Sequence, residues 1–334
     1  MQRRTRVSSA LAGLIALGLA CSACSTGGVA DQAKGSAPPP PTATRTDYTP
    51  YVSATTAADT DDAGSPDTYN LAFVTSEAAG CTPLWGGTTA VTDEAVAARV
   101  EKLTASGADV RVSFGGAAGT EAALTCGSAR ELADAYAEVL DAVGATKADF
   151  DIEGDALTDT ASVTRRNEAL ALLQDERDLD VTYTLPVMPD GLEDTGTAVL
   201  EDAVDQGVEI SAVNIMAMNY STSHDGDMGD YAGSAARAAH DQLVDLLRLS
   251  QEAAWKALHI TVMIGVNDVE GETFTLDDAT SLRDFATRQG VGALSLWAAF
   301  RDQECASGEG TATASDTCSG IDQEAGAFAE ALSG

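Results

Sequence analysis

The chain has 334 residues, and its 52 acidic and 19 basic side chains give it a formal charge of −33 at pH 7. Such a charge argues against nucleic acid and anionic membrane surfaces as partners, because both would repel it. Without its N-terminal leader, the chain keeps roughly 270 residues of globular composition, enough for one large domain or two small ones.

The N-terminal segment 1–24 has the pattern of an export signal. Arginines near its start precede an apolar stretch, 10–20, that is too short to span a bilayer comfortably. Cys24 follows the small residues that close this stretch and resembles the acylated cysteine of a bacterial lipoprotein, with Cys21 as a second candidate for lipidation. Ordinary secretion after Ala23 is the alternative. Both possibilities place the domain outside the cell, either secreted or lipid-anchored to the cell surface.

The segment 25–66 is rich in Pro, Thr, Ala, Ser and Gly and contains the run Pro38–Pro41. Such a composition offers too little apolar surface to bury a core, so we expect a disordered linker. The folded domain is accordingly expected over 67–334.

The expected domain contains four cysteines. An even number outside the cell predicts disulfides, and four cysteines allow three connectivities. The short Gly/Ser/Thr-rich segment between Cys305 and Cys318 favours a bridge between them, which leaves Cys81 with Cys126. Because no histidine lies near them at ligand spacing, a metal site is not expected.

From residue 69 onward, short apolar or β-branched runs alternate with amphipathic helical patterns. Such alternation predicts a parallel sheet covered by helices, and an α/β (β/α)8 TIM barrel fits the size of the domain. A doubly wound open sheet is the alternative, but no glycine-rich phosphate loop follows the first strand. An eighth strand is expected between Thr82 and Thr92. The other expected strands are Asn70–Thr75, Val110–Phe114, Ala148–Glu153, Val181–Val187, Ala212–Met218, Ile260–Val266 and Gly292–Trp297, and the expected helices are Asp93–Ala105, Ala129–Val143, Thr164–Asp175, Ala198–Gln206, Gly233–Ala257, Leu276–Arg288 and Gln323–Leu332.

The third of these strands carries the strongest chemical signal. Side chains alternate along a strand, so Asp149, Asp151 and Glu153 share one face while Phe150 and Ile152 share the other. Neighbours two apart lie about 6–7 Å from each other. Carboxylates this close, with apolar packing behind them, cannot all ionise freely, so one should keep its proton to high pH and can serve as a general acid.

Active sites of such barrels lie at the carboxyl ends of the strands. Polar or unusual residues stand at the expected ends of several strands, which predicts that they gather at one face. They are Ser113, Gly115, Gly116, Glu153, Met188, Asn219, Tyr220, Asn267, Asp268 and Trp297.

Several of these segments together resemble glycoside hydrolase family 18, the chitinases and related endo-N-acetylglucosaminidases. The run Asp149–Glu153 resembles the family's Asp-x-x-Asp-x-Asp-x-Glu signature, and Ser113–Gly116 is similar to its Ser-x-Gly-Gly. Met218–Tyr220 resembles its Met-x-Tyr, and Trp297 stands where the family has a tryptophan at the end of the eighth strand.

The sequence departs from that pattern at two positions. Thr146 replaces the first aspartate of the signature, and Ser221 replaces an acid that often follows the tyrosine. Both departures bear on how the pKa of the acid is tuned.

The resemblance implies cleavage of β-1,4-linked N-acetylglucosamine polymers such as chitin, without metal or organic cofactor, by a retaining mechanism in which the substrate's acetamide is the nucleophile. It implies that Glu153 protonates the glycosidic oxygen. It further implies that Asp151 holds the acetamide, that Asp149 sets the charge of Asp151, and that Tyr220 donates to the acetamide oxygen. The expected substrate-binding residues are Trp297, Met218, Asn219, Ser113, Gly115, Gly116, Met188 and Asn267.

Two other functions stay open at the level of the sequence. One is an endo-β-N-acetylglucosaminidase that acts on N-glycans, and the other is a non-hydrolytic protein that binds chitin or another glycan. The presence of Glu153 argues against the second, because loss of the acid is the usual route to such a protein. The protein is expected to act as a monomer.

Overall fold

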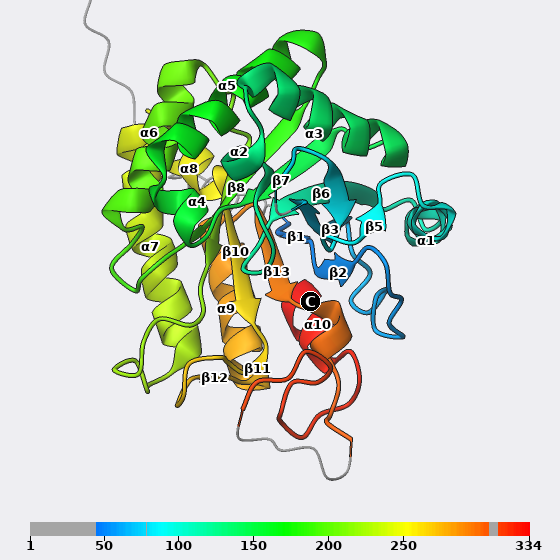
Figure 1. Ribbon diagram of the computed structural model, residues 1–334. Helices are drawn as coiled ribbons and strands as arrows, with labels where there is room; N and C mark the ends of the chain where they lie inside the picture. The colour runs from blue at the N-terminus through cyan, green and yellow to red at the C-terminus, as the bar shows by residue number, and fades with distance from the viewer. Residues whose placement is uncertain (1–44, 78, 307–312) are drawn as a thin grey trace, which may run out of the picture. The chain divides into compact units, whose positions relative to one another are not determined.

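The computed structural model describes residues 45–77, 79–306 and 313–334 (Figure 1). The expected export signal with Cys21 and Cys24, and the part of the expected linker up to residue 44, lie outside the described residues. None of the described helices is both long and apolar enough to cross a membrane.

Parallel strands, each joined to its neighbours by backbone hydrogen bonds, form the centre of the domain. Their spatial order follows the chain, and every pairing between neighbours is parallel. The strands are β3 (Thr68–Ser76), β6 (Asp109–Gly115), β7 (Lys147–Asp151), β8 (Asp180–Pro186), β9 (Ala212–Met216), β10 (Leu258–Met263) and β13 (Ala293–Trp297).

The remaining position of the barrel is taken by a short segment upstream of β3. Its first part, β1 (Asp47–Tyr48), pairs in parallel with β13, and its second part, β2 (Tyr51–Ser53), pairs in parallel with β3. One segment thus contacts both the first and the last of the other strands. The expected (β/α)8 architecture is confirmed.

Two expectations about this region are wrong. The residues between Thr82 and Thr92 form an antiparallel hairpin on β3, with strands β4 (Pro83–Trp85) and β5 (Thr89–Ala90), because Gly86 and Gly87 with positive φ make a tight turn there. The boundary at residue 66 is also wrong, since residues from 47 onward belong to the domain. Tyr48, Tyr51 and Val52 are buried, but they are too few to stand out in a Thr- and Ala-rich segment.

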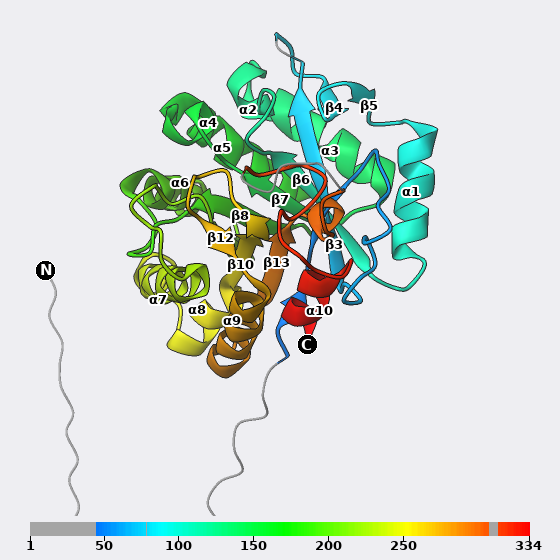
Figure 2. The ribbon, with the colours of Figure 1, turned by 90° about the horizontal axis from the view of Figure 1, so that it is seen from below.

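Helices surround the strands, as the view in Figure 2 shows. The expected helix 233–257 is in fact two helices, because the backbone at Arg248 turns to a φ of +54° and Ser250 caps a new helix. The helices are α1 (Glu94–Thr104), α2 (Ala122–Thr125), α3 (Ala129–Val143), α4 (Asp155–Thr158), α5 (Thr160–Glu176), α6 (Asp194–Gln206), α7 (Met228–Leu246), α8 (Gln251–Ala257), α9 (Leu276–Gln289), α10 (Ala327–Ser333) and the 3-10 turn η1 (Ala299–Arg301).

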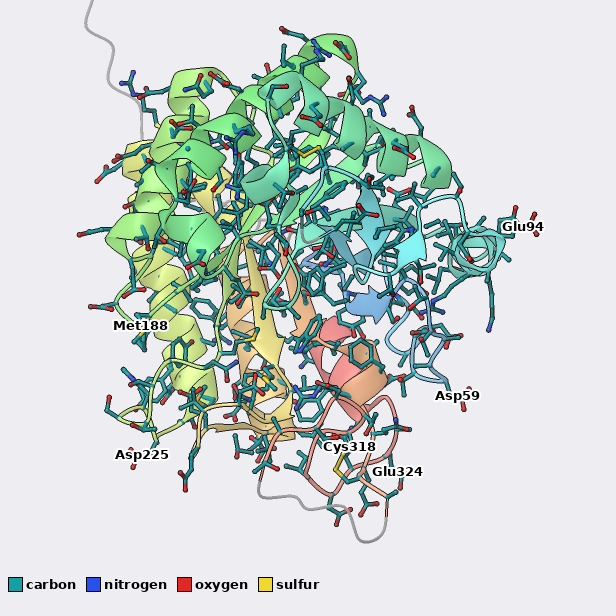
Figure 3. The ribbon with its side chains drawn as sticks, viewed as in Figure 1. Asp59, Glu94, Met188, Asp225, Cys318 and Glu324 are labelled. Carbon is teal, nitrogen blue, oxygen red and sulfur yellow. A yellow bond between two sulfur atoms is a disulfide. The ribbon has the colours of Figure 1, made fainter. Side chains whose placement is uncertain are left out.

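Both expected disulfides are confirmed. Cys81, in the loop after β3, is bonded to Cys126 at the end of α2. Cys305 is bonded to Cys318 in the loop after η1, where Figure 3 labels Cys318. Each bridge therefore joins segments outside the barrel strands, and Cys126 and Cys318 are themselves buried.

Candidate active site

Asp149 lies at the base of the site and is almost completely buried. Its carboxyl accepts hydrogen bonds from three hydroxyl groups, those of Ser113, of Thr184 at 2.6 Å and of Tyr51 at 2.9 Å. Burial raises the pKa of Asp149, and these hydroxyl donors oppose that rise by stabilising its charged form. The carboxyl is thereby held in one position beneath the next acid on the strand.

Asp151 and Glu153 form a carboxyl pair above it. The two side chains are hydrogen-bonded to each other, and one carboxyl oxygen of Asp151 has no partner among the described residues. Burial, Glu153 and then Asp149 raise the pKa of Asp151 well above its usual range. Burial raises the pKa of Glu153, the hydrogen bond from Asp151 lowers it, and Asp268 raises it. The pair therefore retains a proton to higher pH than an isolated carboxyl would retain it.

Two glycines let the neighbouring strand approach this pair closely. Gly115 has a φ of +98°, and a Cβ there would lie 2.1 Å from the carbonyl oxygen of Asp151. Gly116 has a φ of +88°, and a Cβ there would lie 2.8 Å from the ring of Phe73. Its N–H donates to the same carbonyl of Asp151 at 3.0 Å. Only glycine fits either position, because both the backbone angle and the space exclude a side chain.

Aromatic rings form one wall of the site. Trp297 stacks on Phe73 with ring centroids 5.4 Å apart and 22° between the planes, and Tyr51 packs against both rings. These rings and the carboxyl pair enclose a cavity of about 230 Å³. The cavity is lined by Tyr51, Phe73, Ala117, Asp151, Glu153, Thr184, Pro186, Met216, Met218, Asn219, Thr261, Met263, Asp268 and Trp297. An apolar wall facing a few polar groups is the usual composition of a sugar-sized site.

Most residues expected at the site from the sequence are gathered there. Glu153, Asp151, Met218, Asn219 and Trp297 line the cavity. Below and beside it lie Asp149, Ser113, Gly115 and Gly116, which hold the lining residues in place.

Tyr220 is not among the lining residues. Its ring is buried against His224 and Tyr231, with centroids 5.8 Å and 6.0 Å away. Its hydroxyl has no hydrogen-bond partner within the described part of the chain. The strand ends at Met216 and the backbone turns at Asn219, whose φ is +54°, so strand alternation does not predict where Tyr220 points.

Two further expectations differ from the structure. Met188 pairs its backbone with Gly191 beside a separate surface hollow, toward the outside of the molecule (Figure 3). Asn267 is buried, and its amide donates to the carbonyl oxygens of Met263 and Gly265. Both residues therefore shape loops, because the chain has already left the strand where they stand.

The sequence did not indicate several lining residues. Tyr51 lies in the segment taken for a linker, and Phe73 lies inside a strand where an apolar residue predicts only core packing. Thr184 and Thr261 could have been found from strand alternation, since small polar residues facing the barrel interior near a strand end are a usable signal.

No described group of three or more His, Cys, Asp or Glu side chains is arranged to hold a metal ion.

The chain is similar to curated chitinases. It is 35% identical over 275 residues to a probable bifunctional chitinase/lysozyme of Escherichia coli K12, which covers 76% of this chain and 31% of that protein. It is 35% identical over 248 residues to endochitinase 11 of Metarhizium anisopliae, which covers 70% of this chain and 47% of that protein. The chain thus spans about a third to a half of the length of these relatives. No protein-family model matches it.

Solved structures agree with these similarities. The catalytic domain of a hyperthermophilic chitinase from Pyrococcus furiosus superimposes with a TM-score of 0.76 at 28% identity, over 86% of this chain and 94% of that one. A family 18 chitinase from Pseudoalteromonas aurantia shares the fold, with a TM-score of 0.56 at 18% identity, over 76% of this chain and 94% of that one. The chain is therefore similar to chitinases in sequence and in fold, and it shares its fold with a chitinase of glycoside hydrolase family 18.

Proposed function

We propose that the protein is a chitinase-like glycoside hydrolase that cleaves β-1,4-linked N-acetylglucosamine polymers with retention of configuration. One observation carries the proposal. The hydrogen-bonded pair Asp151 and Glu153 opens into a cavity with an aromatic wall, and Asp149 is fixed directly beneath it. The curated relatives, whose names include chitinase and endochitinase, support the same substrate class.

In the first step, the protonated carboxyl of Glu153 gives its proton to the glycosidic oxygen. The carbonyl oxygen of the substrate's own acetamide attacks the anomeric carbon, and the bond to the leaving sugar breaks. This forms a cyclic oxazolinium ion and leaves Glu153 ionised. Asp151 accepts the acetamide N–H and stabilises the positive ring.

In the second step, ionised Glu153 removes a proton from water as the water attacks the anomeric carbon from the face that the leaving sugar vacated. The ring opens, the acetamide is restored, and Glu153 is protonated again. Two inversions at the same carbon give net retention. Tyr220 takes no part in this scheme, because its ring does not line the cavity.

The test is incubation of the purified domain with chitin oligomers, with peptidoglycan and with a high-mannose glycoprotein, followed by mass spectrometry of the products. The proposal expects shortened N-acetylglucosamine oligomers from the first substrate. Release of the N-glycan alone would replace the proposal with an endo-β-N-acetylglucosaminidase. Binding to chitin without any product would replace it with a non-hydrolytic binding protein.

We further infer that the domain acts outside the cell as a monomer, secreted or attached through a lipid on Cys24 or Cys21. Two disulfides support an oxidising compartment. Radiolabelled palmitate should enter the wild-type protein. Loss of the label in Cys24→Ala alone would assign the lipid to Cys24, and loss in Cys21→Ala alone would assign it to Cys21. Absence of label together with protein in the medium would instead indicate simple secretion.

A further inference from the structure

The proposed acid has a second carboxylate near it, supplied by a different loop. Asp268 follows β10 and lies in the loop between β11 (Gly265–Val266) and β12 (Thr273–Phe274). Its side chain lines the same cavity as that of Glu153, and it is open to solvent at that position. After burial and the hydrogen bond from Asp151, the charge of Asp268 is the third influence on the pKa of Glu153, and it raises that pKa.

Asp268 is held in place by Asn219, which lies beyond the end of β9. The amide nitrogen of Asn219 donates to a carboxyl oxygen of Asp268 at 3.2 Å. The amide oxygen accepts the backbone N–H of Asp268 at 2.9 Å and that of Val269 at 3.3 Å. One side chain therefore fixes both the backbone and the carboxylate of the loop.

Asn219 is in turn fixed by Glu272, at the far end of the same loop. The carboxyl of Glu272 is buried and accepts the backbone N–H of Ser221 at 3.0 Å. Burial raises the pKa of Glu272. The backbone N–H groups of Asn219 and Tyr220 also face its carboxyl and oppose that rise. Because each loop holds the other, the carboxylate of Asp268 has a defined position at the cavity despite its exposure.

The charge of one arginine also bears on this carboxylate. Arg301 of η1 is buried, which lowers its pKa to about 10, and Asp268 opposes that fall. Its guanidinium donates to the backbone carbonyls of Ser315, Trp297 and Val266. The charged groups that directly influence the pKa of Glu153 are thus Asp151 from β7 and Asp268 from the loop. Asp149 influences it indirectly through Asp151, and Arg301 does so through Asp268.

We propose that Asp268, held by Asn219, is a positioning residue whose negative charge favours the protonated form of Glu153, the form that delivers a proton to the leaving sugar. The proposal rests on the proposed glycosidase function. It assigns the task to a residue far in sequence from the acidic strand, on the loop that follows the barrel strand β10.

The test compares wild type with Asp268→Asn, which removes the charge and can still accept the hydrogen bond from Asn219. On chitin oligomers, kcat should fall, and the alkaline limb of the kcat/KM profile should move to lower pH by about half a unit or more, because the acid loses its proton sooner. On a 4-nitrophenyl glycoside, whose leaving group needs little protonation, kcat should change much less. Asp268→Glu should restore the alkaline limb.

Glu270→Gln is the matched control, because it removes one exposed negative charge from the same loop without altering a residue that lines the cavity. Its profile should match wild type. An unshifted alkaline limb in Asp268→Asn, an equal shift in Glu270→Gln, or a change confined to KM would overturn the proposal.

Carbon-13 NMR titration of Glu153 needs no substrate and separates this proposal from the proposed function. A lower pKa of Glu153 in Asp268→Asn supports the charge coupling even if wild type releases no product from chitin. The absence of product would then count against the glycosidase alone, while an unchanged pKa of Glu153 would count against the role of Asp268.

Discussion

The carboxyl of Asp151 is hydrogen-bonded to the carboxyl of Glu153, two residues farther along the chain. Burial raises the pKa of both carboxyls, and the charge of Glu153 raises that of Asp151 further, so the pair keeps a proton to higher pH than an isolated carboxyl would. Asp149, which lies beneath, accepts three hydroxyl donors and acts as a fixed acceptor. Asp149 and Asp151 of β7, and Glu153 just beyond its end, thus have different tasks because their surroundings differ.

Replacing the proposed acid is the most direct test of this division. Glu153→Gln keeps the size of the side chain but removes the transferable proton, so kcat on chitin oligomers should fall by about 10²-fold or more. Binding of the oligomers, measured by calorimetry, should persist. Asp155→Asn is the matched control, since Asp155 is an exposed acid near Glu153 and outside the cavity lining. An active Glu153→Gln protein would refute the assignment.

The carboxyl pair should also make stability depend on pH. A carboxyl whose pKa is raised on folding binds its proton more tightly in the native state, so the stability it contributes falls as pH rises above its unfolded pKa near 3.8. Asp151→Asn should therefore raise the free energy of unfolding near pH 7 by about 1–3 kcal/mol. Urea unfolding at several pH values should show this advantage shrinking as pH approaches 4. An advantage that grows toward acid would contradict the raised pKa of Asp151.

Substrate assistance predicts which sugars react and which molecules inhibit. A glucose oligomer lacks the acetamide nucleophile, so it should give no detectable product although its rings could still pack on Trp297. A thiazoline analogue of the cyclised intermediate should bind more tightly than the substrate, because it presents the charge and shape that form during reaction. NMR of the first product should show the β-anomer. A covalent sugar adduct on Asp151 would instead establish a protein nucleophile.

The two disulfides should differ in what their loss affects. Their sequence separations are 45 for Cys81 and Cys126 and 13 for Cys305 and Cys318. Removal of either by paired Cys→Ser changes should cost about 2–4 kcal/mol, measured by thermal unfolding. Only loss of the second should also lower kcat/KM, because Ser319 beside Cys318 accepts the backbone N–H of Val266 at the start of the loop that carries Asp268. Equal kinetic effects of both would contradict this coupling.

Gly115 should tolerate no side chain. Gly115→Ala places a Cβ against the carbonyl of Asp151 at a φ of +98°, and the expected cost is at least about 3 kcal/mol with loss of activity. Gly144→Ala is the control, because Gly144 has a φ of +68° but open space around it, and it should cost only about 1 kcal/mol. Thermal melts of both variants measure the difference. Equal losses of stability in the two variants would show that the close approach of Gly115 to Asp151 adds nothing to the cost of Gly115→Ala.

Local patterns predicted those features that depend on neighbouring residues. Alternation along one strand placed Asp149, Asp151 and Glu153 together, and the change from strand to helix periodicity indicated the barrel. The spacing of the cysteines indicated their pairing. In each case the physical cause acts over a few residues along the chain.

Tertiary structure decided the rest. Tyr51 lies in a barrel strand because its short segment pairs with β13 and β3, and nothing within the segment itself indicates those partners. The left-handed backbone at Asn219 turns Tyr220 away from the cavity, and hydrogen bonds from the same Asn219 fix Asp268 beside Glu153. These placements depend on hydrogen bonds and packing between loops that are distant in sequence, which the sequence of either loop alone does not encode.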